Sequence, residues 1–305
     1  MRINTNTAAM NTYSQLTSAN ASKSGSLAKL SSGLRINKAG DDAAGLAISE
    51  KMKNQISGMT QASRNAQDGI SLIQTAEGGL TETHSILNRM RDLAVQAKND
   101  TNTDEDRGAI QKEMDSLSLE IGRIAEQTEF NGKSLLDGTY KVETNPTATK
   151  SLTFQIGANA KQDIKLNIGD MSKDGLFLTD TEKADGTTVE NKLRVSNLVV
   201  PGEDSDPDTI TAPDFDKVLE TIDTAIKSVS TERANLGATQ NRLDHTVSNL
   251  ATTKENLSEA NSRITDVDMA EEMMSFTKSN ILSQASTAML AQANQMPQGV
   301  LQLLQ

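Results

Sequence analysis

The fold of this chain is decided by residues 56–97, which read ISGMTQASRNAQDGISLIQTAEGGLTETHSILNRMRDLAVQA. Positions taken alternately three and four residues apart fall on one side of an α-helix, which is typical of a helix that lies along other helices. This seam consists of Ile56, Met59, Ser63, Ala66, Ile70, Ile73, Glu77, Leu80, His84, Leu87, Arg91 and Ala94. A helix from about Leu46 to Lys98 would be roughly 80 Å long at about 1.5 Å per residue, so it requires long partners.

A second long helical segment is predicted from Phe215 onward. Every seventh residue in it is apolar: Phe215, Ile222, Val229, Leu236, Leu243, Leu250, Leu257 and Ile264. The companion heptad positions mix apolar with polar residues, which favours a bundle of unequal helices over a simple two-stranded dimer. We therefore predict a helical rod whose core contains Ile70, Ile73, Leu80 and Leu87 from the first segment and Ile222, Val229, Leu236, Leu243, Leu250, Leu257 and Ile264 from the second.

Between these segments the sequence predicts a turn, a shorter helix and a small β region. Residues 99–106 are polar, and apolar residues then recur at helical spacing from Ile110 to Ile124, which predicts a helix folded back on the first. We expect Gly132 to end that helix in a left-handed cap. Alternating apolar residues at 152–156 and 164–168 predict a β-hairpin, and residues 170–214 an exposed insert.

The two ends of the chain are both weakly amphipathic. Residues 1–40 contain the bases Arg2, Lys23, Lys29, Arg35 and Lys38 and no acid, and residues 269–305 are rich in Met and Leu. Amphipathic helices draw most of their stability from packing, so we expect the two ends to pair with each other and with those of neighbouring copies. The residues predicted to mediate this assembly are Ile3, Met10, Leu16, Leu27, Leu30, Leu34, Met273, Leu282, Met289, Leu301 and Leu304.

A basic, Ser-rich N-terminus could instead be an organelle transit peptide. The helical pattern is expected to run on through residues 41–46 without a small-residue processing site, which favours the helical interpretation. The predicted fold is thus mainly α: a long antiparallel helical bundle or coiled coil with paired terminal helices and a small β-hairpin region. We predict three parts, namely 1–45 with 268–305, 46–169 with 215–267, and the variable insert 170–214.

Composition narrows the possible functions. The net charge of −11 disfavours nucleic acid and anionic membranes as partners, and no apolar run is long enough to span a bilayer. Cysteine is absent, which removes disulfides, thiolate metal sites and cysteine nucleophiles. The N-terminus lacks the apolar core of a secretory signal, so any export is expected to follow another route.

No arrangement of residues in the sequence predicts an active site. Of the two histidines, His84 falls on the helical seam without metal-ligand context, and His245 is expected to be solvated. The Gly132–Ser134 run lacks the earlier glycine of a phosphate-binding loop, and the acidic run at 204–208 lacks the glycine and glutamate of a calcium loop. The chain is therefore interpreted as structural, with no enzyme activity and no cofactor.

Four motifs, in this order along the chain, resemble those of bacterial flagellin. LSSGLRIN (30–37) and GDDAAGLAI (40–48) are similar to the family's N-terminal signature, QTEFNGK (127–133) to its internal marker, and AQANQ (291–295) to its C-terminal end. The resemblance covers roughly residues 1–170 and 215–305.

The resemblance implies a subunit that polymerises into the extracellular filament of the bacterial flagellum. The paired terminal helices would form an inner tube around a channel, and the long helices and hairpin an outer tube. Subunits would be exported unfolded by the flagellar type III apparatus and added at the tip, for swimming motility. The implied partners are other copies of the chain, the filament cap and hook-associated proteins, and an export chaperone that covers the C-terminal segment.

The family is also sensed by innate immune receptors. Residues 87–96 resemble the segment read by the animal Toll-like receptor, with Arg89, Leu93 and Glu113 in matching places, and residues 29–49 resemble the peptide sensed by plant receptors. Two alternatives to a filament subunit remain. A hook–filament junction protein shares similar ends, and a secreted coiled-coil scaffold would share the heptads but would not need the two terminal segments.

Overall fold

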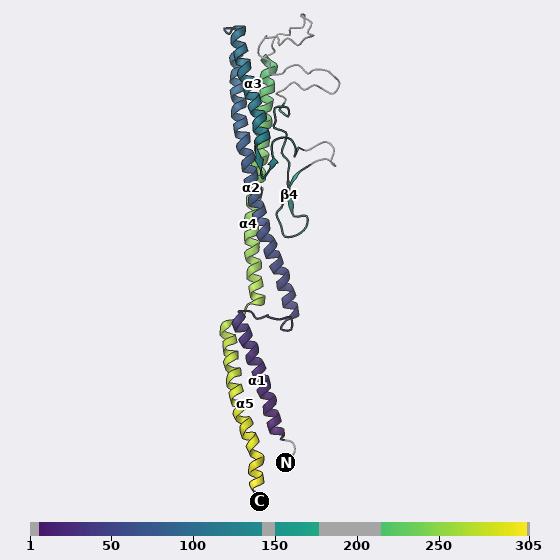
Figure 1. Ribbon diagram of the computed structural model, residues 1–305, viewed down its shortest axis with the longest axis vertical. Helices are drawn as coiled ribbons and strands as arrows, with labels where there is room; N and C mark the ends of the chain where they lie inside the picture. The colour runs from purple at the N-terminus through teal and green to yellow at the C-terminus, as the bar shows by residue number, and fades with distance from the viewer. Residues whose placement is uncertain (1–5, 142–149, 177–214, 304–305) are drawn as a thin grey trace. The chain divides into compact units, whose positions relative to one another are not determined.

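The computed structural model of the chain describes residues 6–141, 150–176 and 215–303, and its side chains as far as residue 295 (Figure 1). These residues form five helices and two strand pairs, which confirms the predicted mainly-α fold with a small β region. The helices are α1 (Thr7–Ser32), α2 (Ala43–Ala97), α3 (Asp104–Gln127), α4 (Phe215–Thr265) and α5 (Met269–Leu303). The strands are β1 (Glu129–Phe130), β2 (Lys133–Ser134), β3 (Leu152–Gln155) and β4 (Asp163–Leu166). None of the described helices is long and apolar enough to cross a membrane.

The chain divides into two compact units. One contains Met1–Ser57 and Thr252–Gln305, here called the terminal unit, and the other contains Gly58–Ala251, here called the central unit. The boundaries fall within α2 and α4. The predicted three-part division, which placed its boundaries near the ends of helices, stays a prediction. The insert 170–214 lies outside the described residues beyond position 176.

The core of the central unit follows the two heptad patterns. Ile73, Leu80 and Leu87 of α2 are fully buried, and Ile70 is half-buried against them. On α4, the fully buried residues are Ile222, Val229, Leu236 and Leu243. Leu250 is also buried, at 9% exposure. Leu257 and Ile264, which belong to the terminal unit, are half-buried.

A second buried strip runs along α2 beside the predicted seam. Its members are spaced seven residues apart and are mostly small: Ala62, Gly69, Ala76, Thr83, Met90 and Ala97. This helix has partners on two sides, because Arg91 pairs with Asp223 of α4 at 2.7 Å and Arg89 pairs with Glu113 of α3 at 2.7 Å. A helix with two partners buries a wider stripe than the single seam of a coiled coil.

The β3–β4 hairpin also packs on α2. The alternating residues predicted this hairpin, and its register pairs Leu152 with Leu166 and Phe154 with Ile164. A side chain at Gly69 of α2 would come within 3.2 Å of the Phe154 ring and 3.4 Å of Leu243 in α4. The glycine thus lets the hairpin and α4 both approach the helix closely.

The expectation that Gly132 caps α3 is wrong. Helix α3 ends at Gln127, and Thr128 after it is extended. Asn131 and Gly132, with φ of 52° and 72°, instead form the two-residue turn between β1 and β2. An Asn-Gly pair suits such a hairpin turn because both positions require positive φ.

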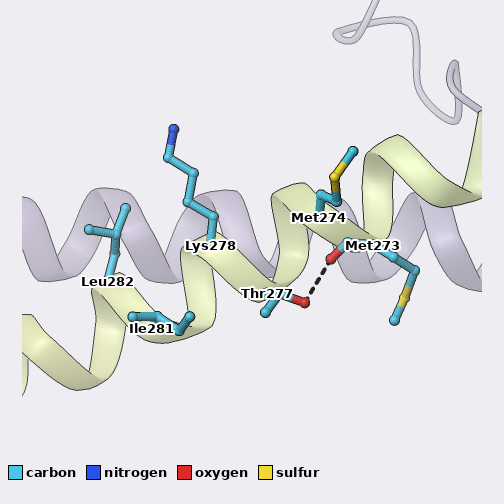
Figure 2. Close-up of a pocket in the computed structure, with 6 residues that line it drawn as sticks. All are labelled: Met273, Met274, Thr277, Lys278, Ile281 and Leu282. Carbon is cyan, nitrogen blue, oxygen red and sulfur yellow. Dashed lines mark hydrogen bonds between the residues drawn. The ribbon is translucent and has the colours of Figure 1, made fainter.

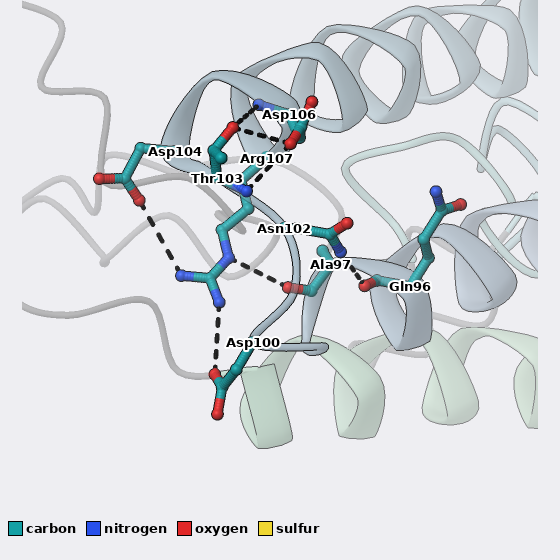
Figure 3. Close-up of polar contacts among 8 residues, drawn as sticks. All are labelled: Gln96, Ala97, Asp100, Asn102, Thr103, Asp104, Asp106 and Arg107. Atoms are coloured by element: carbon teal, nitrogen blue, oxygen red, sulfur yellow. Dashed lines mark hydrogen bonds and ion pairs between the residues drawn. The ribbon is translucent and has the colours of Figure 1, made fainter.

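The turn between α2 and α3 is fixed by local caps. The Thr103 hydroxyl accepts a hydrogen bond from the Asp106 N–H at 3.3 Å, and the Asp106 carboxylate accepts one from the Thr103 N–H at 3.0 Å (Figure 3). This reciprocal capping box satisfies two N–H groups that the helix itself cannot. The hydrogen bonds from Thr103 also lower the pKa of the Asp106 carboxyl.

Arg107 joins the ends of three helices at this turn. Its Nε donates to the Ala97 carbonyl at the end of α2 at 3.2 Å, and its guanidinium lies 5.3 Å from the centre of the Phe215 ring at the start of α4. Its ion-pair partners, Asp100 and Asp104, are exposed (Figure 3), so these pairs contribute little. The main contribution of Arg107 is to satisfy a free carbonyl at a helix end.

We predict that Leu87→Ala lowers the free energy of unfolding by about 2–5 kcal/mol, because it removes a fully buried side chain and leaves a cavity. Leu119→Ala is the matched control, since Leu119 on α3 is 63% exposed and its truncation should change stability by no more than about 0.5 kcal/mol. Urea unfolding followed by circular dichroism measures both. Equal losses in the two variants would contradict the described packing.

A second prediction concerns Glu232 on α4, whose side chain is half-buried. Burial raises its pKa above the ordinary value of 4.5, although hydrogen bonds from the Gly169 N–H and the Asn235 side chain act in the opposite direction. Its Oε1 is buried without a hydrogen-bond partner. The stabilisation contributed by the protonated group is therefore present below the ordinary pKa and is lost as pH rises through the raised value.

Glu232→Gln should accordingly raise the free energy of unfolding at about pH 7 and remove this pH-dependent loss. Glu220→Gln, on the exposed side of the same helix, should leave the pH profile of stability unchanged. Urea midpoints measured across the acidic range test this. A Gln variant that is less stable than the parent at neutral pH would show that the carboxylate is not destabilising there.

Candidate assembly surface on the terminal helices

Helices α1 and α5 are placed by caps at their first residues. Asn6 precedes α1, and its side-chain oxygen accepts a hydrogen bond from the Ala9 N–H at 3.1 Å. Asp268 precedes α5 and accepts from the Ala270 N–H at 2.9 Å. Such caps satisfy N–H groups that would otherwise lack partners. The Asn6 amide also donates to the Ala293 carbonyl at 2.8 Å, so the start of α1 is tied to α5.

The two terminal helices lie side by side and antiparallel (Figure 1). Polar contacts set this register along most of the length of α1. The Ser283 hydroxyl donates to the Asn20 side chain at 2.8 Å, and the Lys23 ammonium donates to the Asn280 side chain at 2.9 Å. Lys29 forms an ion pair with Glu272 at 3.6 Å. Residue numbers therefore rise on one helix as they fall on the other.

The contact between α1 and α5 is made of small side chains. The buried residues on these two helices repeat every seven positions: Ala19 and Ser26 on α1, and Ser279, Ser286 and Ala293 on α5. Small residues at the contact allow two helix axes to come close together. The pattern of large apolar residues in the sequence does not predict this seam. The seven-residue spacing of Ala and Ser was the available signal.

The break between α1 and α2 corrects a second expectation. The helical pattern does not run on through residues 41–46, because α1 ends at Ser32 and α2 begins at Ala43. Gly33 follows α1 with φ of 73°, and its N–H donates to the Lys29 carbonyl at 2.8 Å. A left-handed glycine at this position ends a helix.

Backbone hydrogen bonds then join the end of α1 to the α4–α5 junction. The Arg35 N–H donates to the Thr265 carbonyl at 2.7 Å, and the Val267 N–H donates to the Gly33 carbonyl at 3.1 Å. Asp41 closes the following turn by accepting from the N–H groups of Lys38 and Asn37, which lower the pKa of its carboxyl. One hydrogen-bonded junction thus joins the last residues of α1 to the residues that precede α5.

Many of the large apolar residues of this pair are exposed to solvent. Of the residues predicted to mediate assembly, Met10, Leu27, Met273, Leu282 and Met289 are 48–64% exposed, and Leu16, Leu30 and Leu34 are half-buried. Ile3 and Leu304 lie outside the described residues, and Leu301 lies in the part of α5 whose side chains are not described. Tyr13, Met274 and Ile281 add further exposed apolar surface. We call the exposed apolar side chains of α1 and α5 the terminal apolar surface.

Part of this surface forms an apolar groove on α5. It is lined by Met273, Met274, Thr277, Lys278, Ile281 and Leu282, which follow one another at one-turn spacing (Figure 2). Thr277 donates its hydroxyl to the Met273 carbonyl at 2.8 Å, so its polar group is satisfied within the helix and its methyl group remains available to the groove. An exposed apolar patch of this kind marks an interaction site.

The residues matched to an immune receptor are only partly brought together. The guanidinium of Arg89 contacts Glu113 across α2 and α3 through Nη2 at 2.7 Å and Nε at 3.1 Å, and both side chains are about half exposed. Leu93 is 2% exposed and belongs to the core of the central unit. It is not available for direct contact, because its side chain is buried in this hydrophobic core.

The exposed apolar side chains of the terminal helices are suited to association with another surface. Among the described residues, no group of three or more His, Asp or Glu side chains could hold a metal ion. His84 lies half-buried on the α2 seam with its Nδ1 unpartnered, and His245 is exposed. The most prominent feature of the terminal unit is therefore its uncovered apolar surface.

Two family models match the chain. Residues 3–141 match the one described as "Bacterial flagellin N-terminal helical region", and residues 219–304 match "Bacterial flagellin C-terminal helical region". The first match includes α1, α2 and α3, and the second includes most of α4 and α5. Together they cover nearly all of the terminal unit, the whole of α2 and most of α4.

Full-length relatives extend this match. The chain is 57% identical to the flagellin of Bacillus subtilis strain 168 and 46% identical to the flagellar filament 33 kDa core protein of Treponema phagedenis, with 100% of each chain covered in both comparisons. A solved structure assigned to a flagellar hook-associated protein of Vibrio parahaemolyticus is similar in fold, with a TM-score of 0.55 at 18% identity. It covers 74% of this chain and is itself covered completely.

The described pairing of α1 and α5 can be tested with cysteines, since the natural chain has none. The double variant Asn20→Cys/Ser283→Cys should form an intrachain disulfide under mild oxidation, because these side chains are hydrogen-bonded at 2.8 Å. In the control, Asn20→Cys/Met274→Cys, the second thiol replaces a side chain that is 67% exposed. Non-reducing electrophoresis and peptide mapping distinguish the products. An intrachain disulfide in the control and none in the first variant would overturn the register.

Proposed function

The chain belongs to the bacterial flagellin family and is a structural subunit of the extracellular flagellar filament; from this we propose that it polymerises through the terminal apolar surface. It serves motility as a structural protein and is not an enzyme. The observation that carries the proposal is the exposure of Met10, Leu27, Met273, Leu282 and Met289 on a helix pair whose described buried residues are all small.

The energetics support association through this surface. Fully burying one Leu or Met side chain contributes about 1.5–3 kcal/mol, so several of them together supply a large driving force for assembly. The terminal apolar surface has one part on α1 and another on α5, and these two parts differ in sequence. A contact between unlike patches that does not close into a ring propagates as a helical polymer.

Further proposals rest on membership of the family. Subunits are exported unfolded by the flagellar type III apparatus and added at the filament tip, beneath the cap and beyond the hook-associated proteins. Before export, a chaperone covers α5, whose apolar groove would otherwise promote premature association in the cytoplasm. The uncovered groove supports such a partner because it is apolar and lies on the C-terminal helix.

Proposed recognition by innate immune receptors also rests on membership of the family. The exposed Arg89–Glu113 pair is the proposed contact for an animal Toll-like receptor, and Leu93 supports the helix beneath it. Residues 29–49, proposed to be read by plant receptors, include the end of α1, the junction and the start of α2.

We predict that Leu282→Gln raises the critical concentration for seeded polymerisation by about ten- to a hundredfold, since it replaces roughly 1.5–3 kcal/mol of apolar burial with a polar group. Leu282→Met is the matched control, because it keeps similar volume and apolar character and should polymerise at nearly the parental concentration. Sedimentation of depolymerised protein on short filament seeds measures both values.

Equal critical concentrations for the Gln and Met variants would contradict burial of Leu282 in the polymer. Circular dichroism of the unpolymerised variants provides the folding check. Leu282 is exposed, so neither substitution should reduce helix content.

A further inference from the structure

The methionines of this chain divide between the two units according to exposure. Where their side chains are described, those that are exposed all lie on α1 or α5 of the terminal unit: Met10, Met269, Met273, Met274 and Met289, at 49–67%. The buried ones, Met90, Met114 and Met171, all lie in the central unit, at 7% exposure or less. Met52 and Met59 of α2 are half-buried.

Exposure decides how fast a thioether reacts with a peroxide. In this reaction the sulfur of methionine takes one oxygen atom from a hydroperoxide, which is reduced to water or an alcohol, and the thioether becomes a sulfoxide. The product is polar and chiral, so a flexible apolar side chain becomes one that resists burial. The sulfur atoms of Met273 and Met274 lie at the ends of side chains that extend away from α5 (Figure 2), so a peroxide can reach them.

The consequence differs between the two units. In the central unit the sulfurs of Met90 and Met114 are enclosed by the hydrophobic core, so its packing is shielded from the reagent. In the terminal unit the reactive side chains are 49–67% exposed, and the buried positions of the α1–α5 contact are Ala and Ser. Oxidation would therefore leave the fold of the subunit intact and change only the surface that other copies must cover.

We propose that Met10, Met269, Met273, Met274 and Met289 are oxidation sites through which a hydroperoxide blocks polymerisation of the free subunit. The inference rests on the proposed assembly through the terminal apolar surface. In the polymer the same sulfurs are covered by neighbouring copies, so the modification acts on subunits before they are added. Enzymatic reduction of the sulfoxide to the thioether reverses it.

The test compares oxidation of unpolymerised subunits with that of filaments made from the same full-length protein. Both are exposed to hydrogen peroxide, and sulfoxide at each methionine is quantified by peptide mass spectrometry. In free subunits the five surface methionines should oxidise at least about tenfold faster than Met90, Met114 and Met171. In filaments this difference should largely disappear. Seeded sedimentation of the oxidised subunits should show a critical concentration raised by about tenfold or more.

Two matched variants identify the residues responsible. A variant with all five surface methionines changed to Leu keeps the apolar character and should polymerise normally after peroxide treatment. A variant with Met90, Met114 and Met171 changed to Leu should remain sensitive to peroxide. Treatment of the oxidised parental protein with methionine sulfoxide reductases should restore polymerisation. Circular dichroism of the oxidised subunit should show unchanged helix content.

The outcomes separate this inference from the proposed function. If the surface methionines oxidise and polymerisation is unchanged, while Leu282→Gln still blocks it, the oxidation proposal is wrong and assembly through the terminal apolar surface stands. If neither change affects polymerisation, the assembly surface itself is misassigned. If the five-Leu variant stays as sensitive as the parent, other sites mediate the effect and the proposal is overturned.

Discussion

The distance between two packed helices depends on the side chains that lie between them, and in the α1–α5 pair these are alanines and serines repeated every seven residues. The buried positions of this seam hold small side chains, whereas Met10, Leu27, Leu282 and Met289 are about half or more exposed. The pair leaves its hydrophobic residues outside and is held in register by polar contacts such as Asn20–Ser283. The proposed role of the terminal helices in assembly depends on this arrangement.

The central unit, in contrast, buries its large apolar side chains between its own helices. Its seams contain Leu80, Leu87, Leu236 and Leu243, all fully buried, and a second strip of mostly small residues on α2 admits a further set of partners. Its charged residues form exposed pairs between helices, such as Arg91 with Asp223, which contribute little energy but favour this register over others. The unit thus has a core of its own, whereas the terminal unit leaves much of its apolar surface uncovered.

Most of the fold could be predicted from the sequence, because two long heptad patterns and one period-two pattern are strong and uninterrupted. The first residue of α4, Phe215, and the β3–β4 hairpin were both predicted from periodicity. The errors arose where a short local signal had two meanings. Gly132 could cap a helix or form a hairpin turn, and the preceding Asn131 favoured the turn. Gly33 ends α1 although helix-forming residues continue beyond it, because its φ is positive and its carbonyl accepts a hydrogen bond from the Val267 N–H in the junction.

The candidate site was harder to predict, for a physical reason. Periodicity identifies which residues share a helix face, but it does not distinguish a face buried within one chain from a face buried between chains. The large residues of α1 and α5 were therefore found, and the small seam that turns them outward was not. Leu93 shows the reverse problem, since motif similarity indicated a contact residue and the structure buries it. Burial depends on tertiary partners, which a local pattern does not contain.

Association with other copies stabilises the folded form of a subunit. Binding to the folded form alone shifts the folding equilibrium in proportion to the logarithm of partner concentration. In this chain we expect association to stabilise mainly the terminal unit, because its apolar side chains are exposed. The core of the central unit is already buried within one chain. Methionine suits the uncovered positions, since its flexible side chain can adapt to neighbours of slightly different geometry. The terminal helices are thus the part of the chain whose stability depends most on the presence of other copies.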